Sequence, residues 1–211
     1  MSLDYLFQRP DRVWAFTLEH LGLSATAILV ALLVAVPLGI LATRFKRLTL
    51  PTLSLLGVVY TIPSLAFLAL LIPGLGIGRT PALVVLATYA QLFLVRNIVA
   101  GLRGVGTATL EAAVGQGMTP WQVFARVRWP LALPVMLAGL RTAFVTTISL
   151  ATVAAWIDAG GLGTLLFEGI SRNAPNRILA GAVAITALAL LADGLLRLAE
   201  RQTAAARARR A

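Results

Sequence analysis

Residue types that build common catalytic and metal sites are scarce in this sequence of 211 residues. It contains no cysteine, which excludes disulfides, thiolate metal sites and cysteine nucleophiles. His20 is the only histidine and Lys46 the only lysine, so a histidine metal cluster is excluded. A P-loop for ATP is excluded too, because no G-x-x-x-x-G-K-[ST] segment is present. With no evident carboxylate pair or Ser-His-Asp set, we do not expect catalysis by this chain.

Charge is also scarce. Only 12% of the residues are charged and 59% are hydrophobic, whereas a soluble domain has about 25% charged residues. The composition therefore predicts a membrane protein embedded in a lipid bilayer. The net charge of +10 does not indicate nucleic-acid binding, because the basic residues flank apolar runs and do not interleave with aromatic residues.

Five apolar runs have the ~20 residues that a helix needs to cross ~30 Å of hydrocarbon. Helices are expected because backbone groups must be satisfied within the segment in lipid, and no alternating strand pattern appears. The expected spans are residues 21–42, 53–72, 82–100, 131–157 and 178–198. We therefore predict an all-α, polytopic membrane protein in which residues 1–211 form a single transmembrane domain.

The distribution of Lys and Arg predicts the orientation of these spans. One side holds eleven of them: Arg44, Lys46, Arg47, Arg103, Arg126, Arg128, Arg197, Arg201, Arg207, Arg209 and Arg210. The other side holds five: Arg9, Arg12, Arg79, Arg172 and Arg177. The richer side is expected to be cytoplasmic, which places the N-terminus outside and the C-terminus inside. The aromatic N-terminal stretch is expected to act as an interfacial anchor, and the basic tail, residues 203–211, to lie at the membrane surface.

A polar segment, residues 107–130, separates the third and fourth spans on the predicted cytoplasmic side. Residues 110–114 are expected to form a short helix closed by Gly115 or Gly117, either of which can adopt a positive φ. A second helix is expected to begin with a capping hydroxyl, a first-turn proline and a capping-box partner, at Thr119, Pro120 and Gln122. Helices this short need something to pack on, so the segment either lies on lipid headgroups or docks a soluble partner.

The order of residues in this segment resembles the EAA loop of ABC importer permeases. The matching positions are Glu111, Ala112, Ala113, Gly117, Val127 and Pro130. Trp129 stands where that family usually has leucine. The similarity extends to VPLGIL, VVYTIPSLAFLALLIPGLGIG, LPVMLAGLRTA and DAGGLGTLLFEGIS, which resemble the branch that imports osmoprotectants such as glycine betaine, carnitine and choline.

The resemblance implies a fold and a set of partners. The fold would be that of a type I ABC importer permease, and the loop would be the coupling helix that docks on a separate ATP-binding subunit. That subunit would hold ATP and Mg, so this chain would need no cofactor of its own. A second permease copy, identical or related, and an extracytoplasmic substrate-binding protein would complete the assembly in the inner cell membrane.

Three alternatives remain open at this point. An importer of amino acids or methionine has similar five-span permeases and differs in the cargo of its binding protein. A self-sufficient channel would conduct ions without a partner. A membrane-embedded enzyme is the third alternative, and the missing catalytic sets count against it.

Pro37 and Pro63 lie inside expected spans. Each is expected to kink or break its helix, because proline removes a backbone hydrogen bond and frees a carbonyl. Such breaks can mark substrate paths or serve only in packing, and packing is favoured for Pro37. Tyr60 and Ser64 place polar groups beside Pro63, so these three residues are candidates for lining a translocation path.

Arg141 lies about ten residues into the fourth span, or ~15 Å deep, where it must face the bundle or a water-filled path. Two hypotheses follow, a path or gating role and a structural ion pair. Asp193 is within reach of Arg141, but Arg197, four residues after Asp193 on the same helical face, is its simpler partner. Asn97, the last path candidate, is expected to hydrogen-bond across helices.

The outer side carries further polar features. A tight turn followed by a short helix is expected at three glycines, Gly160, Gly161 and Gly163. Asp158 and Glu168 are expected outside the membrane, either solvated or in contact with a binding protein. His20 is expected at the membrane interface, at the outer edge of the first span.

Overall fold

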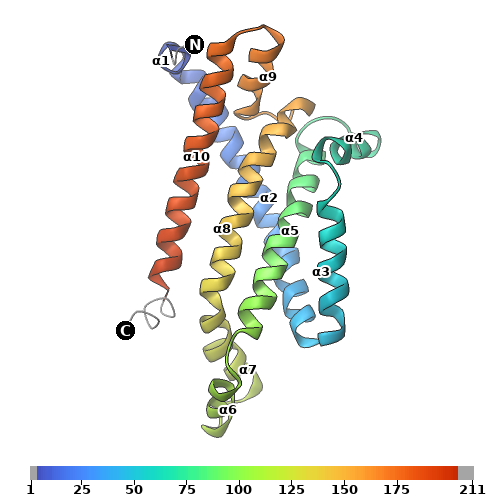
Figure 1. Ribbon diagram of the computed structural model, residues 1–211, viewed down its shortest axis with the longest axis vertical. Coiled ribbons are helices and arrows are strands. Elements are labelled where there is room, and N and C mark those ends of the chain that lie inside the picture. Colours follow the sequence, from blue (N-terminus) through green and yellow to red (C-terminus); the bar gives the residue numbers. More distant parts are fainter. Residues whose placement is uncertain (1–3, 204–211) are drawn as a thin grey trace.

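The computed structural model describes residues 4–203, and every regular element in that range is helical (Figure 1). In chain order these are α1 (Asp4–Gln8), α2 (Pro10–Arg44), α3 (Lys46–Tyr60), α4 (Ser64–Leu75), α5 (Arg79–Arg103), α6 (Thr107–Gly115), α7 (Pro120–Gln122), the π-helix η1 (Val123–Arg128), α8 (Trp129–Ala154), the 3-10 helix η2 (Ala155–Ile157), α9 (Gly163–Ser171) and α10 (Pro175–Gln202). The predicted all-α fold is confirmed. The basic tail that we expected at the membrane surface lies, apart from Thr203, outside the described residues.

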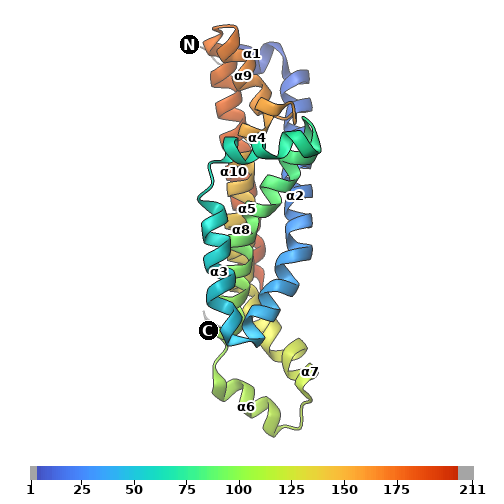
Figure 2. The same cartoon turned by 90° about the vertical axis from the view of Figure 1, so that its right-hand side faces the viewer.

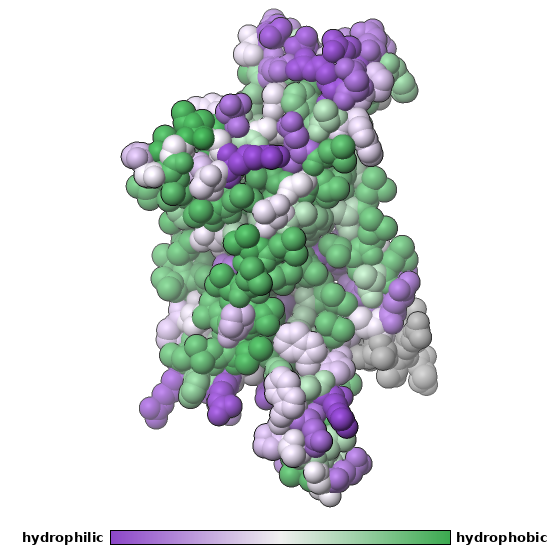
Figure 3. All heavy atoms as spheres, turned by 180° about the vertical axis from the view of Figure 1, so that it is seen from behind, coloured by the Kyte–Doolittle hydropathy of each residue, from purple (hydrophilic) through white to green (hydrophobic). Residues whose placement is uncertain are grey.

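Four helical segments of the described chain are long and apolar enough to cross a membrane: Pro10–Arg44, Arg79–Arg103, Pro120–Ile157 and Pro175–Gln202. They contain the first, third, fourth and fifth expected spans. Figure 3 shows the resulting surface, a broad hydrophobic band with hydrophilic side chains gathered at both ends. Of the aromatic N-terminal stretch, Tyr5 and Phe7 lie on α1, whereas Trp14 and Phe16 lie in the first turns of α2.

The second expected span, residues 53–72, is formed by two helices that are long and apolar enough to cross a membrane only when taken together. α3 ends at Tyr60, α4 begins at Ser64, and the two are bent by 91° at this break. In Figure 2, α4 lies across the bundle whereas α3 runs along it. The break stands where Pro63 was expected to kink or break the helix, because proline has no N–H to continue the hydrogen-bond ladder. Pro37, by contrast, lies inside α2 without interrupting it.

The centre of the bundle is formed by α2, α5 and α8, which approach closely at glycines. A Cβ atom at Gly139 of α8 would lie 2.3 Å from the Asn97 Cβ of α5. A Cβ at Gly39 of α2 would lie 2.6 Å from Ile98. Small residues of this kind let membrane helices pack backbone to backbone, because lipid provides no hydrophobic drive between helices.

The end of the bundle that carries α9 is held together by polar contacts. The Glu168 carboxylate of α9 lies 3.2 Å from Arg12 of α2 and 3.2 Å from Arg177 of α10. The expectation that Glu168 is simply solvated is therefore wrong. The expected glycine turn and short helix are confirmed, since Gly160 and Gly161 have φ of 81° and 84° and α9 follows.

His20, which was expected at the membrane interface, is packed inside the protein. Its side chain is fully buried, and its Nε2 lies 2.8 Å from the Ile148 carbonyl oxygen of α8. The neighbouring Glu19 accepts a hydrogen bond of 3.0 Å from the Gly161 backbone N–H. α2 runs beyond the span expected from hydropathy, so this turn of the helix is covered by α8 and the glycine loop.

The chain enters and leaves the bundle at opposite ends. α1 and α9 lie at one end in Figure 1, while α6, α7 and the described end of α10 lie at or beyond the other. The α6–α7 segment extends beyond the ends of α2 and α3 (Figure 2). This placement makes it the most projecting part of the described chain.

Candidate functional site

The site begins with α6, a helix of nine residues that carries the Glu-Ala-Ala sequence. Ala113 is its only buried residue, with 5% of its surface exposed. Glu111 and Ala112 are exposed, and so is Val114, at 60%. A helix this short is marginal by itself in water, and most of its surface is left free for a partner.

The turn after α6 is made by Gly117 and not by Gly115. Gly117 has φ of 80°, a left-handed conformation that glycine adopts without steric cost. Its N–H donates to the Val114 carbonyl at 2.9 Å, and the Met118 N–H donates to Ala113 at 3.2 Å. These two bonds form a Schellman motif, which satisfies carbonyls that a helix end leaves unpaired. Gly115 is the last helical residue.

The second helix begins as the sequence predicts. The Thr119 N–H donates to the Gln122 side-chain oxygen at 2.9 Å, and the Gln122 N–H donates to the Thr119 hydroxyl at 3.3 Å. Pro120 occupies the first turn. This reciprocal capping box satisfies two otherwise unpaired donors.

The boundary expected between this helix and the fourth span is absent. Pro120–Ile157 runs as one helical segment of 38 residues, with η1 between α7 and α8. In an α-helix the Pro130 ring would clash with the carbonyl of Arg126, four residues earlier. The backbone widens to a π-turn instead, in which the Trp129 N–H donates to Phe124, five residues earlier. The Trp129 ring packs against Phe124 with centroids 5.8 Å apart.

A groove of about 510 Å³ lies between α6 and η1. It is lined by Ala108, Thr109, Ala112, Ala113, Gln116, Met118 and Val127. The fold thus brings together Ala112, Ala113 and Val127 of the six predicted coupling residues. Glu111 lies on the exposed surface of α6, Gly117 forms the turn and Pro130 sets the π-turn. Their roles are therefore different.

Three of the predicted path residues meet at the break between α3 and α4. The Tyr60 ring makes edge contacts with Tyr89 and Phe93 of α5, at centroid distances of 5.4 and 5.3 Å. Pro63 is exposed and Ser64 is half-buried. Tyr89, which we did not predict, donates a hydrogen bond to the Ile62 carbonyl in the break. The sequence does contain a signal for this contact. Tyr89 lies within an apolar span, and a buried tyrosine hydroxyl needs a hydrogen-bond partner.

Asn97 and Arg141 do not join this group. The Asn97 side chain donates to the Phe93 carbonyl of its own helix at 2.8 Å, so the expected bond across helices is wrong. Arg141 faces α10, and Figure 1 shows α10 and α3 on opposite sides of the α5–α8 pair. The predicted path residues therefore belong to separate places in this chain.

Arg141 forms an ion pair with Asp193, with 3.0 Å between Nη1 and Oδ1. Arg197 also pairs with Asp193, at 3.3 Å, so the local pair that seemed simpler is only part of the arrangement. Glu200 lies 3.5 Å from the Arg141 Nε. Two arginines and two carboxylates balance one another here, as charge at membrane depth requires. This arrangement supports the structural-pair hypothesis for Arg141.

Comparison with known proteins adds independent findings. The sequence profile of the family "Binding-protein-dependent transport system inner membrane component" matches residues 35–204. The chain is 43% identical over 186 residues to the choline transport system permease protein OpuBB of Bacillus subtilis (strain 168), covering 88% of this chain and 86% of that protein. It is 40% identical over 203 residues to the osmoprotectant import permease protein OsmW of Salmonella typhimurium (strain LT2), covering 92% and 93%.

Solved structures agree in fold. An amino acid ABC transporter crystallised with histidines matches with a TM-score of 0.75 at 21% identity, covering 96% of this chain and 99% of that one. An inward-facing MetNI methionine ABC transporter matches with a TM-score of 0.72 at 22% identity, covering 94% and 99%. At these identities the likeness concerns the fold alone.

Proposed function

Because the chain belongs to the family of binding-protein-dependent transport system inner membrane components, we propose that it is the permease subunit of an ATP-driven importer of osmoprotectants. Glycine betaine, carnitine and choline are the expected cargos. Support comes from relatives at 40% identity or more, which are named as choline and osmoprotectant permeases. The chain itself would catalyse nothing.

The observation that carries the coupling role is the position and exposure of α6. It projects from one end of the bundle (Figure 2) and has a single buried residue. A separate ATP-binding subunit would receive this helix, and it would hold the ATP and Mg that this chain cannot bind for lack of a P-loop. Movement of that subunit would reach the membrane through the continuous segment that begins at Pro120.

We also propose an orientation. The α6 end would face the cytoplasm, since Arg44 ends α2 and Lys46 and Arg47 begin α3 at that end and basic residues are retained on the cytoplasmic side. The α9 end would face outward and meet the substrate-binding protein. A path along Tyr60, Pro63 and Ser64 would need a second wall, because Pro63 is exposed at the surface of the single chain. A second permease copy would supply it.

The coupling role is tested by site-directed crosslinking, for which a chain without cysteine needs no background removal. Ala112→Cys on α6 and Ser171→Cys at the opposite end, both exposed, would each carry a maleimide-linked benzophenone in the assembled importer. Ala112→Cys should crosslink to the ATP-binding subunit and Ser171→Cys should not. Equal crosslinking from both positions, or from neither, would count against α6 as the coupling helix.

The cargo is tested by uptake into proteoliposomes that contain the assembled importer and its binding protein. Glycine betaine, choline, histidine and methionine are compared with and without ATP. ATP-dependent uptake of the first two alone is the expected result. Uptake of histidine or methionine instead would identify an amino-acid importer. Ion conductance by the permease alone would favour a channel.

A further inference from the structure

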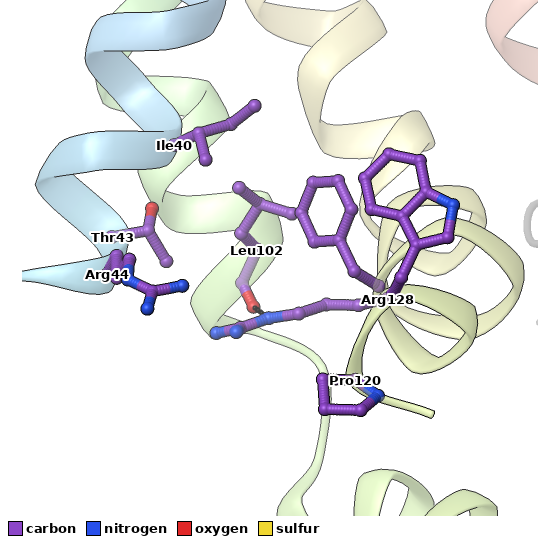
Figure 4. A pocket seen from close by; sticks show the side chains of 8 residues that line it. Ile40, Thr43, Arg44, Leu102, Pro120 and Arg128 are labelled. Atoms are coloured by element: carbon purple, nitrogen blue, oxygen red, sulfur yellow. Dashed lines mark hydrogen bonds between the residues drawn. The ribbon is translucent and has the colours of Figure 1, made fainter. Parts of the chain in front are cut away.

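A second cavity of the described chain, of about 530 Å³, lies away from the groove under α6 (Figure 4). It is lined by Ile40, Thr43, Arg44, Leu102, Pro120, Trp121, Phe124 and Arg128. These residues come from the ends of α2 and α5 and from the start of the α7–η1 segment. The cavity is therefore at the level where α2 leaves the expected first span, which ends at residue 42.

The two charges in this cavity have the same sign. Figure 4 shows the guanidinium groups of Arg44 and Arg128 pointing toward one another. The Arg128 Nε donates to the Leu102 carbonyl at 2.9 Å, which fixes the direction of that side chain. No acidic residue lines the cavity, and within residues 4–203 neither arginine forms an ion pair. Two cations that face the same cavity repel each other unless an anion lies between them.

The rest of the lining is apolar. Ile40, Leu102 and Phe124 provide aliphatic and aromatic surface, and Trp121 leaves 72% of its surface exposed. Tryptophan is enriched at membrane–water interfaces, where its ring sits among headgroups. The Thr43 hydroxyl already donates a hydrogen bond of 2.8 Å to the Gly39 carbonyl. The occupant that matches this chemistry is an anion attached to a hydrocarbon.

We propose that this cavity binds the phosphate headgroup of an anionic phospholipid, with Arg44 and Arg128 on the phosphate and the acyl chains leaving along the apolar face of α2. Basic pockets between transmembrane helices on the cytoplasmic side are suited to anionic headgroups. The bound lipid would join α2 to the first turn of the segment that follows α6. This role does not depend on which cargo is transported.

The test is native mass spectrometry of the full chain in detergent, titrated separately with dioleoyl phosphatidylglycerol and dioleoyl phosphatidylcholine. The wild-type chain should retain phosphatidylglycerol preferentially. Arg44→Gln should lower that preference about fivefold, the contribution of one basic residue near an anionic surface. Arg47→Gln, an exposed arginine at the same end that does not line the cavity, should leave it unchanged. Arg44→Lys should retain most of it, and it provides a folded comparison if Arg44→Gln aggregates.

Two further measurements distinguish a bound lipid from other possible occupants of the cavity. Inorganic phosphate at the lipid's concentration should not displace phosphatidylglycerol, and adding the ATP-binding subunit should leave the lipid bound. Displacement by phosphate would identify a site for free anions. Displacement by the subunit would show that the cavity belongs to the protein interface. Either result, or equal loss of lipid binding in Arg44→Gln and Arg47→Gln, would overturn the proposal.

Discussion

The Tyr89 hydroxyl of α5 donates a hydrogen bond to the Ile62 carbonyl in the break between α3 and α4. Tyr89 is buried, with 4% of its surface exposed, and its ring also contacts Tyr60 and Phe67. A break within a membrane span frees backbone carbonyls that only another protein group can satisfy in lipid. Tyr89 therefore fixes the place where α4 turns across the bundle.

Replacing this tyrosine tests that role. Tyr89→Phe keeps the ring and removes the donor, so it should lower the free energy of unfolding in mixed detergent micelles by about 0.5–1.5 kcal/mol, the net contribution of one hydrogen bond. Tyr60→Phe is the matched control, because in the part of the chain that the structure describes the Tyr60 hydroxyl forms no hydrogen bond. Equal stability of the two variants would show that the bond does not hold the break.

The ion pair between Arg141 and Asp193 should make a measurable coupling between α8 and α10. In a double-mutant cycle with Arg141→Gln and Asp193→Asn, we expect a coupling energy of about 1 kcal/mol, a typical value for polar contacts between membrane helices. Arg197→Gln should change the unfolding free energy by less, because Arg197 is 53% exposed and exposed pairs contribute little. A coupling energy near zero, together with abolished uptake in a stable Arg141→Gln chain, would restore the gating hypothesis.

The left-handed turn at Gly117 predicts that substitutions at this position differ in how strongly they weaken association with the ATP-binding subunit. A Cβ at this position meets nothing within 4 Å, so the constraint is its φ of 80° and not space. Gly117→Val should strain the backbone by about 1–2 kcal/mol and reduce the ATP-binding subunit that copurifies with the chain. Gly117→Asn should be tolerated better, since asparagine visits this conformation.

The adjacent glycine is the control for this series. Gly115→Ala lies at the end of α6 with open space around it and no positive φ, so alanine should preserve association. Membrane insertion should be the same in Gly117→Val, Gly117→Asn and Gly115→Ala. Loss of association in Gly115→Ala but not in Gly117→Val would contradict the assignment of the turn.

Because α5 and α8 pack closely at Gly139, we expect even alanine at this position to destabilise the protein. Gly139→Ala would bring its Cβ within 2.3 Å of the Asn97 Cβ, and overpacking of this kind destabilises by about 1–3 kcal/mol. Gly194→Ala on α10 meets nothing within 4 Å and should be neutral in the same thermal unfolding measurement. Asn97→Gly should partly restore Gly139→Ala, because it removes the atom that clashes. An unaffected Gly139→Ala chain would show that α5 and α8 separate freely.

Local features of this molecule were predictable from local residues. The capping box at Thr119 and the left-handed turn depend on groups within a few positions of one another. The break at Pro63 depends only on a missing N–H. Four of the five spans follow from the length of their apolar runs, because the bilayer sets that length.

Features that depend on distant residues were not predictable in the same way. His20 is buried because Ile148, 128 positions later, provides an acceptor for its ring. The partner of Arg141 depends on how α10 lies against α8, which apolar composition does not specify. The π-turn before Pro130 was also not predicted. The polar segment was expected to end at this proline, whereas the helix continues past it because the backbone widens to a π-turn.

The continuous segment from Pro120 to Ile157 has a mechanical consequence. At 1.5 Å per residue its 38 residues measure about 57 Å, well beyond the hydrocarbon thickness. Gly139, where a Cβ would lie 2.3 Å from the Asn97 Cβ of α5, stands midway between its ends. The segment is also supported nearer its ends, since a Cβ at Gly101 of α5 would lie 2.8 Å from Ala132 and His20 of α2 contacts Ile148. A helix supported along its length in this way would transmit a displacement at Pro120 to Ile157 as a rigid body.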